Sequence, residues 1–156
     1  MNLDDLLRIV PGLRRWRSIN ARDLGRLLSR EPWECIWCGM IVPKRRRSWC
    51  SDECVHAFRS RCDSAYAARI VTEAARGICA ICGVDTIAAE QIRRYSICFA
   101  RGRWREVDHV VPVCEGGGLC GPLGLRLLCG ACHAKESDAL AERRRIARRK
   151  MRSENH

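Results

Sequence analysis

The chain has 156 residues, with 29 lysines and arginines against 18 aspartates and glutamates, a formal net charge of +11 and a pI near 9.4. Twelve cysteines accompany only 6% aromatic residues, so cross-links are expected to replace part of a large hydrophobic core. No stretch approaches the roughly 20 apolar residues of a membrane span, and the acidic N-terminus lacks the features of a secretory signal. We therefore expect a reduced, cytoplasmic protein, in which zinc thiolates are favoured over disulfides.

The basic charge favours nucleic acid as the partner. A basic protein at a membrane surface would instead carry its cations along a large apolar helix face, whereas here the arginines adjoin cysteine clusters. Nucleic acid is accordingly the expected partner and a membrane is not.

Residues 1–30 predict a helical N-terminal segment. Leu3, Leu6, Leu7 and Val10 recur at helical spacing before a Pro-Gly pair. Asn20 is placed to cap a second helix, whose apolar face contains Leu24, Leu27 and Leu28. Both stripes are read as packing surfaces, with partner binding as the alternative.

Residues 31–76 contain two cysteine pairs, Cys35/Cys38 and Cys50/Cys54, separated by eleven residues. The first pair precedes a predicted hairpin and the second begins a predicted helix, an arrangement that resembles a treble-clef zinc finger. Four thiolates complete the tetrahedral shell of a structural zinc ion. His56 is then an ordinary surface histidine and not a fifth ligand.

A basic run and a long helix complete this segment. Lys44, Arg45, Arg46 and Arg47 are placed at the hairpin tip, where they form either a solvated turn or a phosphate contact. From Phe58 to about Arg76 apolar residues recur every four positions, which predicts one connecting helix ending at Gly77. Cys62 lies on that stripe and is read as a core residue.

Residues 77–156 contain a second set of four thiolates, Cys79, Cys82, Cys129 and Cys132. Forty-six residues separate the two pairs, so a large insertion lies between them. Three further cysteines, Cys98, Cys114 and Cys120, are read as structural or free thiols. Two structural zinc ions are therefore predicted for the chain.

The insertion and its flanks carry the strings "VDHVVPVCEGGG" and "LRLLCGACH". This pattern resembles the HNH endonucleases, in particular the branch stapled by paired Cys-x-x-Cys motifs, which occurs in bacterial and phage proteins and in the HNH domain attached to some annealing helicases. The resemblance covers about residues 77–145. It implies a ββα-metal fold, a bacterial or phage-encoded protein, and one catalytic divalent cation, Mg²⁺ or Mn²⁺, with Zn²⁺ or Ni²⁺ as alternatives.

The resemblance also implies roles for three residues: Asp108 and His133 as ligands of the catalytic cation, and His109 as the general base. A histidine that titrates near neutral pH can accept a proton from the attacking water. A cation neutralises charge on the transition state and on the leaving 3′ oxygen. Adjacent strand residues point to opposite sides, so Asp108 and His109 can share a site only if the strand ends there.

One position departs from the family pattern. The Asn that stands between the two histidines, and that orients the base, is replaced here by Gly124. Backbone or water contacts must substitute for it, or the activity is weakened or lost.

Further arginines extend the predicted DNA contacts. Arg101, Arg103 and Arg105 alternate on a strand before Asp108, and Arg144 and Arg148 belong to a basic C-terminal helix. The sequence thus predicts an α+β protein of small zinc-stabilised modules, a treble-clef finger plus a ββα-metal HNH domain, that hydrolyses DNA phosphodiester bonds. A non-catalytic zinc-stabilised DNA-binding protein on an HNH scaffold is the alternative, an RNA-binding or assembly factor is a third, and the oligomeric state is left open.

Overall fold

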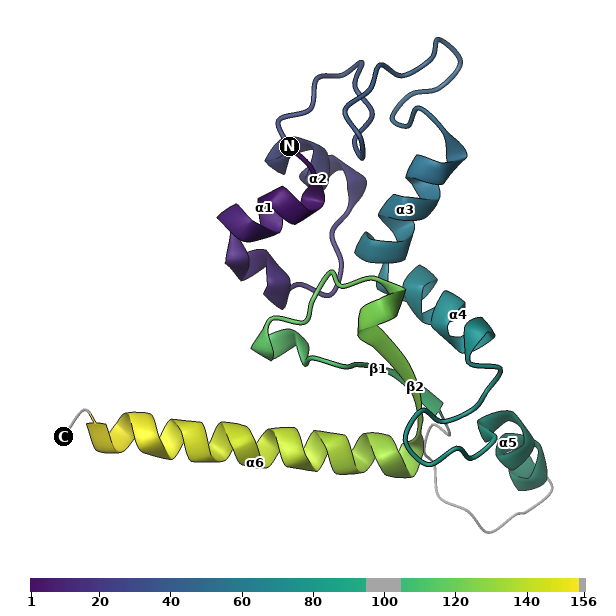
Figure 1. The fold of residues 1–156 in the computed structure, drawn as a ribbon, viewed down its shortest axis with the longest axis vertical. Helices are drawn as coiled ribbons and strands as arrows, with labels where there is room; N and C mark the ends of the chain where they lie inside the picture. Colours follow the sequence, from purple (N-terminus) through teal and green to yellow (C-terminus); the bar gives the residue numbers. More distant parts are fainter. Residues whose placement is uncertain (95–104, 155–156) are drawn as a thin grey trace. The chain divides into compact units, whose positions relative to one another are not determined.

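A computed structural model describes residues 1–94 and 105–154, whose contacts gather into two compact units (Figure 1). Unit 1 comprises residues 1–74 and 109–126, and unit 2 comprises residues 75–108 and 127–156. The described architecture is mixed helix and small sheet, which confirms the predicted α+β class. Predicted contacts at Arg101 and Arg103, and the thiol of Cys98, lie outside the described residues.

Unit 1 begins with two short helices, α1 (Leu3–Ile9) and α2 (Ala21–Leu27), joined through a 3₁₀ turn, η1 (Pro11–Arg15). The Asn2 side chain accepts from Asp5 N while the Asp5 carboxylate accepts from Asn2 N, a capping box that starts α1. Asn20 caps α2 by accepting from Asp23 N, as predicted. Because the caps satisfy otherwise unpaired N–H groups, both helices form despite being only seven residues long.

The core of unit 1 joins these helices to the first zinc module. The apolar stripes of α1 and α2 pack with residues from the third helix and from the loop that follows the Asp-His pair; the buried members are Leu3, Leu6, Leu7, Leu13, Ile19, Leu24, Leu28, Phe58, Cys62 and Leu119. Val10, predicted on the stripe, is instead 40% exposed. Arg61 reinforces the junction by donating to both carboxylate oxygens of Asp4, at 2.8 and 2.9 Å.

The predicted helix from Phe58 to Arg76 is two helices, and this expectation was wrong. The helices are α3 (Asp52–Cys62) and α4 (Ser64–Ala74), which Figure 1 shows as successive segments with a break between them. Asp63 has extended backbone angles, and its carboxylate accepts from the backbone N–H groups of Ala65 and Tyr66. A side chain that competes for helical N–H groups ends one helix and starts the next. The four-residue spacing of apolar side chains continues through Asp63, so this spacing gave no sign of the break.

The segment after the Asp-His pair returns to unit 1. It contains two 3₁₀ turns, η2 (Val113–Glu115) and η3 (Pro122–Gly124). Gly118 N donates to the Arg14 carbonyl at 2.6 Å, and Leu119 is 1% exposed. The glycine-rich loop is therefore a packed connection that closes over the N-terminal helices.

Unit 2 contains α5 (Thr86–Arg94), the strand pair β1 (Arg105–His109) and β2 (Leu125–Cys129), whose terminal residues pass into unit 1, and α6 (Gly130–Glu154). Its buried cluster consists of Leu128 with three of the cysteines, Cys79, Cys129 and Cys132. α6 has 25 residues, and Figure 1 shows it as one unbroken helix, which confirms helical continuity from Cys132. Most of its side chains are exposed, so a core does not account for its length. None of the described helices is both long and apolar enough to span a bilayer.

Candidate metal centres and nucleic-acid interface

Two zinc knuckles with the same local plan stand in the two units. Each is a C-x-x-C-G string, "CIWCG" at Cys35 and "CAICG" at Cys79, and each is closed by one isolated antiparallel bridge. In both, the N–H of the last residue donates to the carbonyl of the first cysteine, at 2.8 and 2.9 Å. Gly39 and Gly83 adopt φ values of +80° and +72°, a left-handed conformation that glycine adopts without penalty. The glycine after each Cys-x-x-Cys is a sequence signal that the cysteine count alone missed.

The second half of each centre comes from the start of a helix. Cys54 lies in the first turn of α3, where its N–H donates to the capping Ser51 Oγ, and Cys50 precedes that turn. In unit 2, Cys129 ends β2 and Cys132 lies in the first turn of α6. The expected hairpin between the pairs of unit 1 does not form: the Glu34–Ile41 bridge encloses the first pair, and turns and bends follow it up to Cys50. Pro43, which lacks an N–H to continue a ladder, accounts for that difference.

The four sulfur atoms of each set converge on a volume suited to one ion. In both sets, Cys35/Cys38/Cys50/Cys54 and Cys79/Cys82/Cys129/Cys132, all four Sγ atoms lie within 4.8 Å of one another. Printed separations are 3.4 Å for Cys38–Cys50, 3.5 Å for Cys50–Cys54 and 3.7 Å for Cys82–Cys129. A tetrahedral zinc with Zn–S bonds of about 2.3 Å places its sulfurs about 3.8 Å apart. Both clusters therefore fit zinc, as predicted.

The knuckles also lower the pKa of their first cysteine. Burial favours the neutral thiol of Cys35, but backbone N–H groups of Cys38, Cys50 and Trp37 outweigh it and lower the pKa to about 7. The same balance, with donors from Cys82, Cys129 and Ile81, lowers the pKa of Cys79 to about 6. Burial and the neighbouring sulfurs instead raise the pKa of Cys54 and of Cys132 to about 12. Zinc binding would release the protons that the last cysteines retain.

The remaining described cysteines lie apart from both clusters. Cys62 is 1% exposed in the core of unit 1, which confirms its assignment as a core residue. Cys114 is exposed and Cys120 is half-buried. His56 is exposed on α3 and its Nδ1 lies 2.9 Å from the Tyr66 hydroxyl, so it takes no part in the metal cluster.

The three residues assigned to catalysis lie at element boundaries. Asp108 and His109 are the last two residues of β1, both half-buried, so the strand ends where the shared-site argument requires. His133 follows the zinc-cluster residue Cys132 in the first turn of α6 and is also half-buried. Within the described residues, the only groups of three or more ligand side chains gathered within 4.8 Å are the two cysteine sets. The structure therefore does not collect Asp108, His109 and His133 into a third such group.

The backbone of Gly124, which has no side chain, makes a hydrogen bond to the turn's neighbouring strand end. Its carbonyl accepts from Val110 N at 2.9 Å, which ties this turn to the residue directly after His109. A Cβ added at Gly124 would lie 2.5 Å from Cys120 Cβ and 2.6 Å from Cys120 Sγ. Cys120 thus occupies the space that an asparagine side chain would need.

The basic residues predicted to contact DNA in unit 1 and on β1 differ in their exposure and in whether an acidic side chain pairs with them. Lys44, Arg45 and Arg47 are exposed, in turns that follow the knuckle rather than at the tip of a hairpin. Arg46 donates to Asp52 at 2.9 Å, so part of its charge is neutralised. Arg105 begins β1 and is half-buried with a polar partner of its own.

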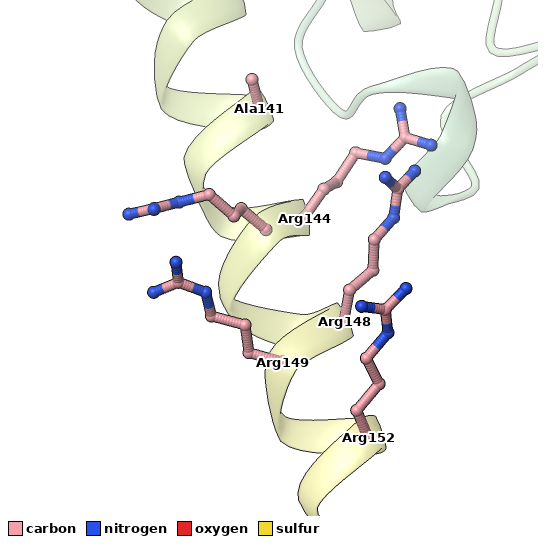
Figure 2. A pocket seen from close by; sticks show the side chains of 6 residues that line it. Ala141, Arg144, Arg148, Arg149 and Arg152 are labelled. Atoms are coloured by element: carbon pink, nitrogen blue, oxygen red, sulfur yellow. The ribbon is translucent and has the colours of Figure 1, made fainter.

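The arginines of α6 form a continuous stripe. Figure 2 shows Arg144, Arg148 and Arg152 on one side of the helix with their guanidinium groups extended in the same direction, and Arg149 on another side. Positions four apart stack along one helix face at intervals of about 6 Å. Arg145, by contrast, is paired with Glu142 at 2.7 Å. The stripe is a surface on which a polyanion fits.

The fold and the clusters thus define a small α+β protein with two candidate zinc centres and basic surfaces. The chain is 25% identical over 134 residues to the bovine protein named DNA annealing helicase and endonuclease ZRANB3, 28% over 127 residues to the mouse protein of that name, and 26% over 142 residues to the human one. These alignments cover 69%, 65% and 72% of this chain but only 12%, 12% and 13% of the respective relatives. The similarity supports a DNA-related function.

No family model matches the chain, and no solved structure matches it.

Proposed function

We propose that this protein is a metal-dependent DNA endonuclease of the HNH type. The observation that carries the proposal is the placement of Asp108 and His109 at the end of β1 and of His133 directly after a zinc-cluster cysteine at the start of α6. A structural zinc that fixes Cys132 would also fix the backbone of His133. The relatives' printed name, which includes endonuclease, supports the same conclusion.

The donor set suits a divalent cation. Asp108 offers a carboxylate and His133 an imidazole, both half-buried, and oxygen with nitrogen donors accept Mg²⁺, Mn²⁺, Zn²⁺ or Ni²⁺. When bound, such a cation supplies charge neutralisation for the transition state and the leaving oxygen. His109 would accept the proton of a water that attacks phosphorus, while the bond from phosphorus to the leaving 3′ oxygen breaks. The Val110–Gly124 hydrogen bond would position the backbone beside His109.

A specific observation favours a second candidate, a non-catalytic DNA-binding protein on the same scaffold. Gly124 has no side chain to orient His109, and Cys120 fills the adjacent space. The zinc clusters and the basic stripe of α6 would serve binding without any of the three catalytic residues.

Plasmid nicking decides between the two. The zinc-loaded protein is incubated with supercoiled DNA with and without added Mg²⁺ or Mn²⁺. His109→Ala should abolish nicking, Asp108→Ala and His133→Ala should raise the cation concentration that nicking needs, and all should keep their zinc. His56→Ala, a change of an exposed histidine outside both clusters, is the matched control and should cleave normally. A parent protein that does not nick DNA would support the non-catalytic binding function. A His109→Ala variant that still nicks DNA would refute His109 as the general base.

A further inference from the structure

Unit 1 contains a pocket that neither the zinc centre nor the proposed catalytic residues use. It has a volume of about 260 Å³ and is lined from four segments: α2, the turn that follows it, Ile36 of the first Cys-x-x-Cys, and the chain just before Cys50. Its cationic lining residues are Arg22, Arg26, Arg30 and Arg47. Two carboxylates, Glu31 and Glu34, also line it, which leaves the arginines in excess by two charges.

One of these arginines is held by hydrogen bonds to backbone carbonyls, whereas the other three have exposed guanidinium groups that a ligand can reach. Arg30 donates to the carbonyls of Met1, Ile36 and Trp37 at 2.8, 3.4 and 3.3 Å, so its guanidinium is locked in place. Arg26 makes one long contact of 3.7 Å with Asp23, and its side chain is 74% exposed, so that pair neutralises little. Within the described part of the chain, Arg22 and Arg47 are exposed and no ion pair engages them. The pocket therefore offers three available guanidinium groups on a rigid frame.

An exposed tryptophan adjoins the same wall. Glu34 N donates to the Glu31 carbonyl at 2.9 Å, which closes a four-residue turn, and three members of this turn, Glu31, Pro32 and Glu34, line the pocket. The fourth member is Trp33, whose exposed fraction is 60%. A bulky aromatic residue held at a tight turn loses little conformational freedom when a ligand stacks on it.

From this juxtaposition we infer that unit 1 binds a single-stranded segment of DNA, with a backbone phosphate in the arginine pocket and an unpaired base stacked on Trp33. Guanidinium groups recognise phosphate oxygens by paired hydrogen bonds. Cations that track the backbone beside an aromatic platform are the usual means of binding single strands. In a duplex both faces of each base are already stacked, so Trp33 selects for unpaired bases. The inference rests on the proposed DNA-directed function and specifies part of its substrate, an unpaired strand.

The first test removes pocket charge. Binding of a short oligo-dT strand and of a blunt duplex of equal length is measured by fluorescence anisotropy, with zinc retained and no catalytic cation added. Arg22→Gln with Arg26→Gln should weaken strand binding about tenfold and lower the slope of log affinity against log salt by about 0.7 per lost phosphate contact. Arg15→Gln with Arg17→Gln removes the same charge from exposed positions of unit 1 outside the pocket. This control should cost no more than about twofold, because distant exposed charges are screened. Equal losses for the two pairs would overturn the pocket.

The second test removes the aromatic platform. Trp33→Ala should weaken oligo-dT binding by about fivefold to a hundredfold and duplex binding by less than about twofold, whereas Trp33→Phe should retain most of the strand affinity. Trp16→Ala, an exposed tryptophan of unit 1 outside the pocket, is the control and should bind as the parent does. An unchanged strand affinity, or equal losses on strand and duplex, would overturn base stacking. Inorganic phosphate added at millimolar concentration should displace the strand from the parent more readily than from the Arg22/Arg26 variant; equal displacement would overturn phosphate capture in the pocket.

The two proposals fail in different ways. A parent protein that nicks duplex DNA but binds no oligo-dT refutes the strand site alone. A parent that never nicks, yet prefers oligo-dT through Arg22, Arg26 and Trp33, refutes the nuclease alone.

Discussion

At the residue scale, Gly124 and Cys120 constrain one another. An asparagine at position 124, as in the HNH pattern that the sequence resembles, would not fit directly, because its Cβ would lie 2.5 Å from the Cys120 Cβ. The Gly124 carbonyl nevertheless holds Val110 N, so a backbone contact ties the turn to the end of β1. Placing an asparagine at position 124, as in the HNH pattern that the sequence resembles, therefore requires changes at both Gly124 and Cys120.

Gly124→Asn alone should destabilise unit 1 by about 1–3 kcal/mol, because a Cβ is forced against Cys120. Combined with Cys120→Gly, the asparagine has room and should raise metal-dependent nicking, since positioning a general base is worth roughly 10²–10⁴ in rate. Cys120→Gly alone is the control. Thermal unfolding and nicking rates of the four proteins measure both effects, and an inert, folded double variant would show that orientation of His109 is not what limits activity.

At the element scale, the repeated unit is the zinc knuckle. Its two copies share the C-x-x-C-G string, the bridge and the left-handed glycine, but their surroundings differ. A Cβ at Gly39 would lie 2.6 Å from the Arg30 guanidinium, whereas a Cβ at Gly83 would meet nothing within 4 Å.

Gly83→Ala should therefore cost about 1–2 kcal/mol, the penalty of a left-handed alanine. Gly39→Ala should cost at least about 1 kcal/mol more, because it also displaces an arginine that donates to three carbonyls. Denaturant unfolding of each zinc-loaded variant measures the loss in the unit concerned. Equal losses would mean that Arg30 moves aside without losing its hydrogen bonds.

The other informative element is α6. Most of its side chains are exposed, and its most regular feature is a row of arginines rather than an apolar packing face. Its arginine stripe recurs every four residues, and one neighbouring arginine is neutralised by Glu142. One face of α6 thus carries more unpaired positive charge than the face that contains Arg145.

Arg144→Gln with Arg148→Gln should weaken duplex binding about tenfold and reduce the salt slope by about 2, because each phosphate contact contributes about 0.9. Arg145→Gln with Arg149→Gln, displaced by one residue on the same helix, removes equal formal charge but should have a smaller effect. Titrations between 50 and 200 mM salt test this, and indistinguishable pairs would show that the stripe acts only through net charge.

At the scale of the whole molecule, each unit has its own cysteine cluster that could hold a zinc ion. Unit 2 buries few residues besides Leu127, Leu128, Thr86 and its cysteines, whereas unit 1 adds a larger core of leucines to its cluster. We therefore expect metal binding and folding to be closely coupled in unit 2.

Native mass spectrometry should find two zinc ions per chain. Cys79→Ser should leave one and unfold unit 2, since structural zinc contributes on the order of 10–16 kcal/mol apparent at neutral pH. Cys114→Ser, an exposed thiol outside both clusters, should retain two. A stable folded protein without zinc would contradict the prediction.

The sequence by itself determined two kinds of feature. Asn20 specified a helix start and the pattern through Cys132 specified a continuous final helix, because both rest on contacts between residues near in the chain. The eight cysteines specified both clusters through the chemistry of their paired motifs, although Cys82 and Cys129 lie 47 positions apart. The break at Asp63 was equally local but was masked by an apolar period that continued through it.

Only the tertiary structure decided the contacts between distant segments. The Arg61–Asp4 pair, the return of residues 109–126 to unit 1, and the gathering of Arg47 with Arg22 and Arg26 around one pocket each join residues separated by turns and helices. Such contacts depend on how the helices pack against one another, and no periodicity encodes that packing.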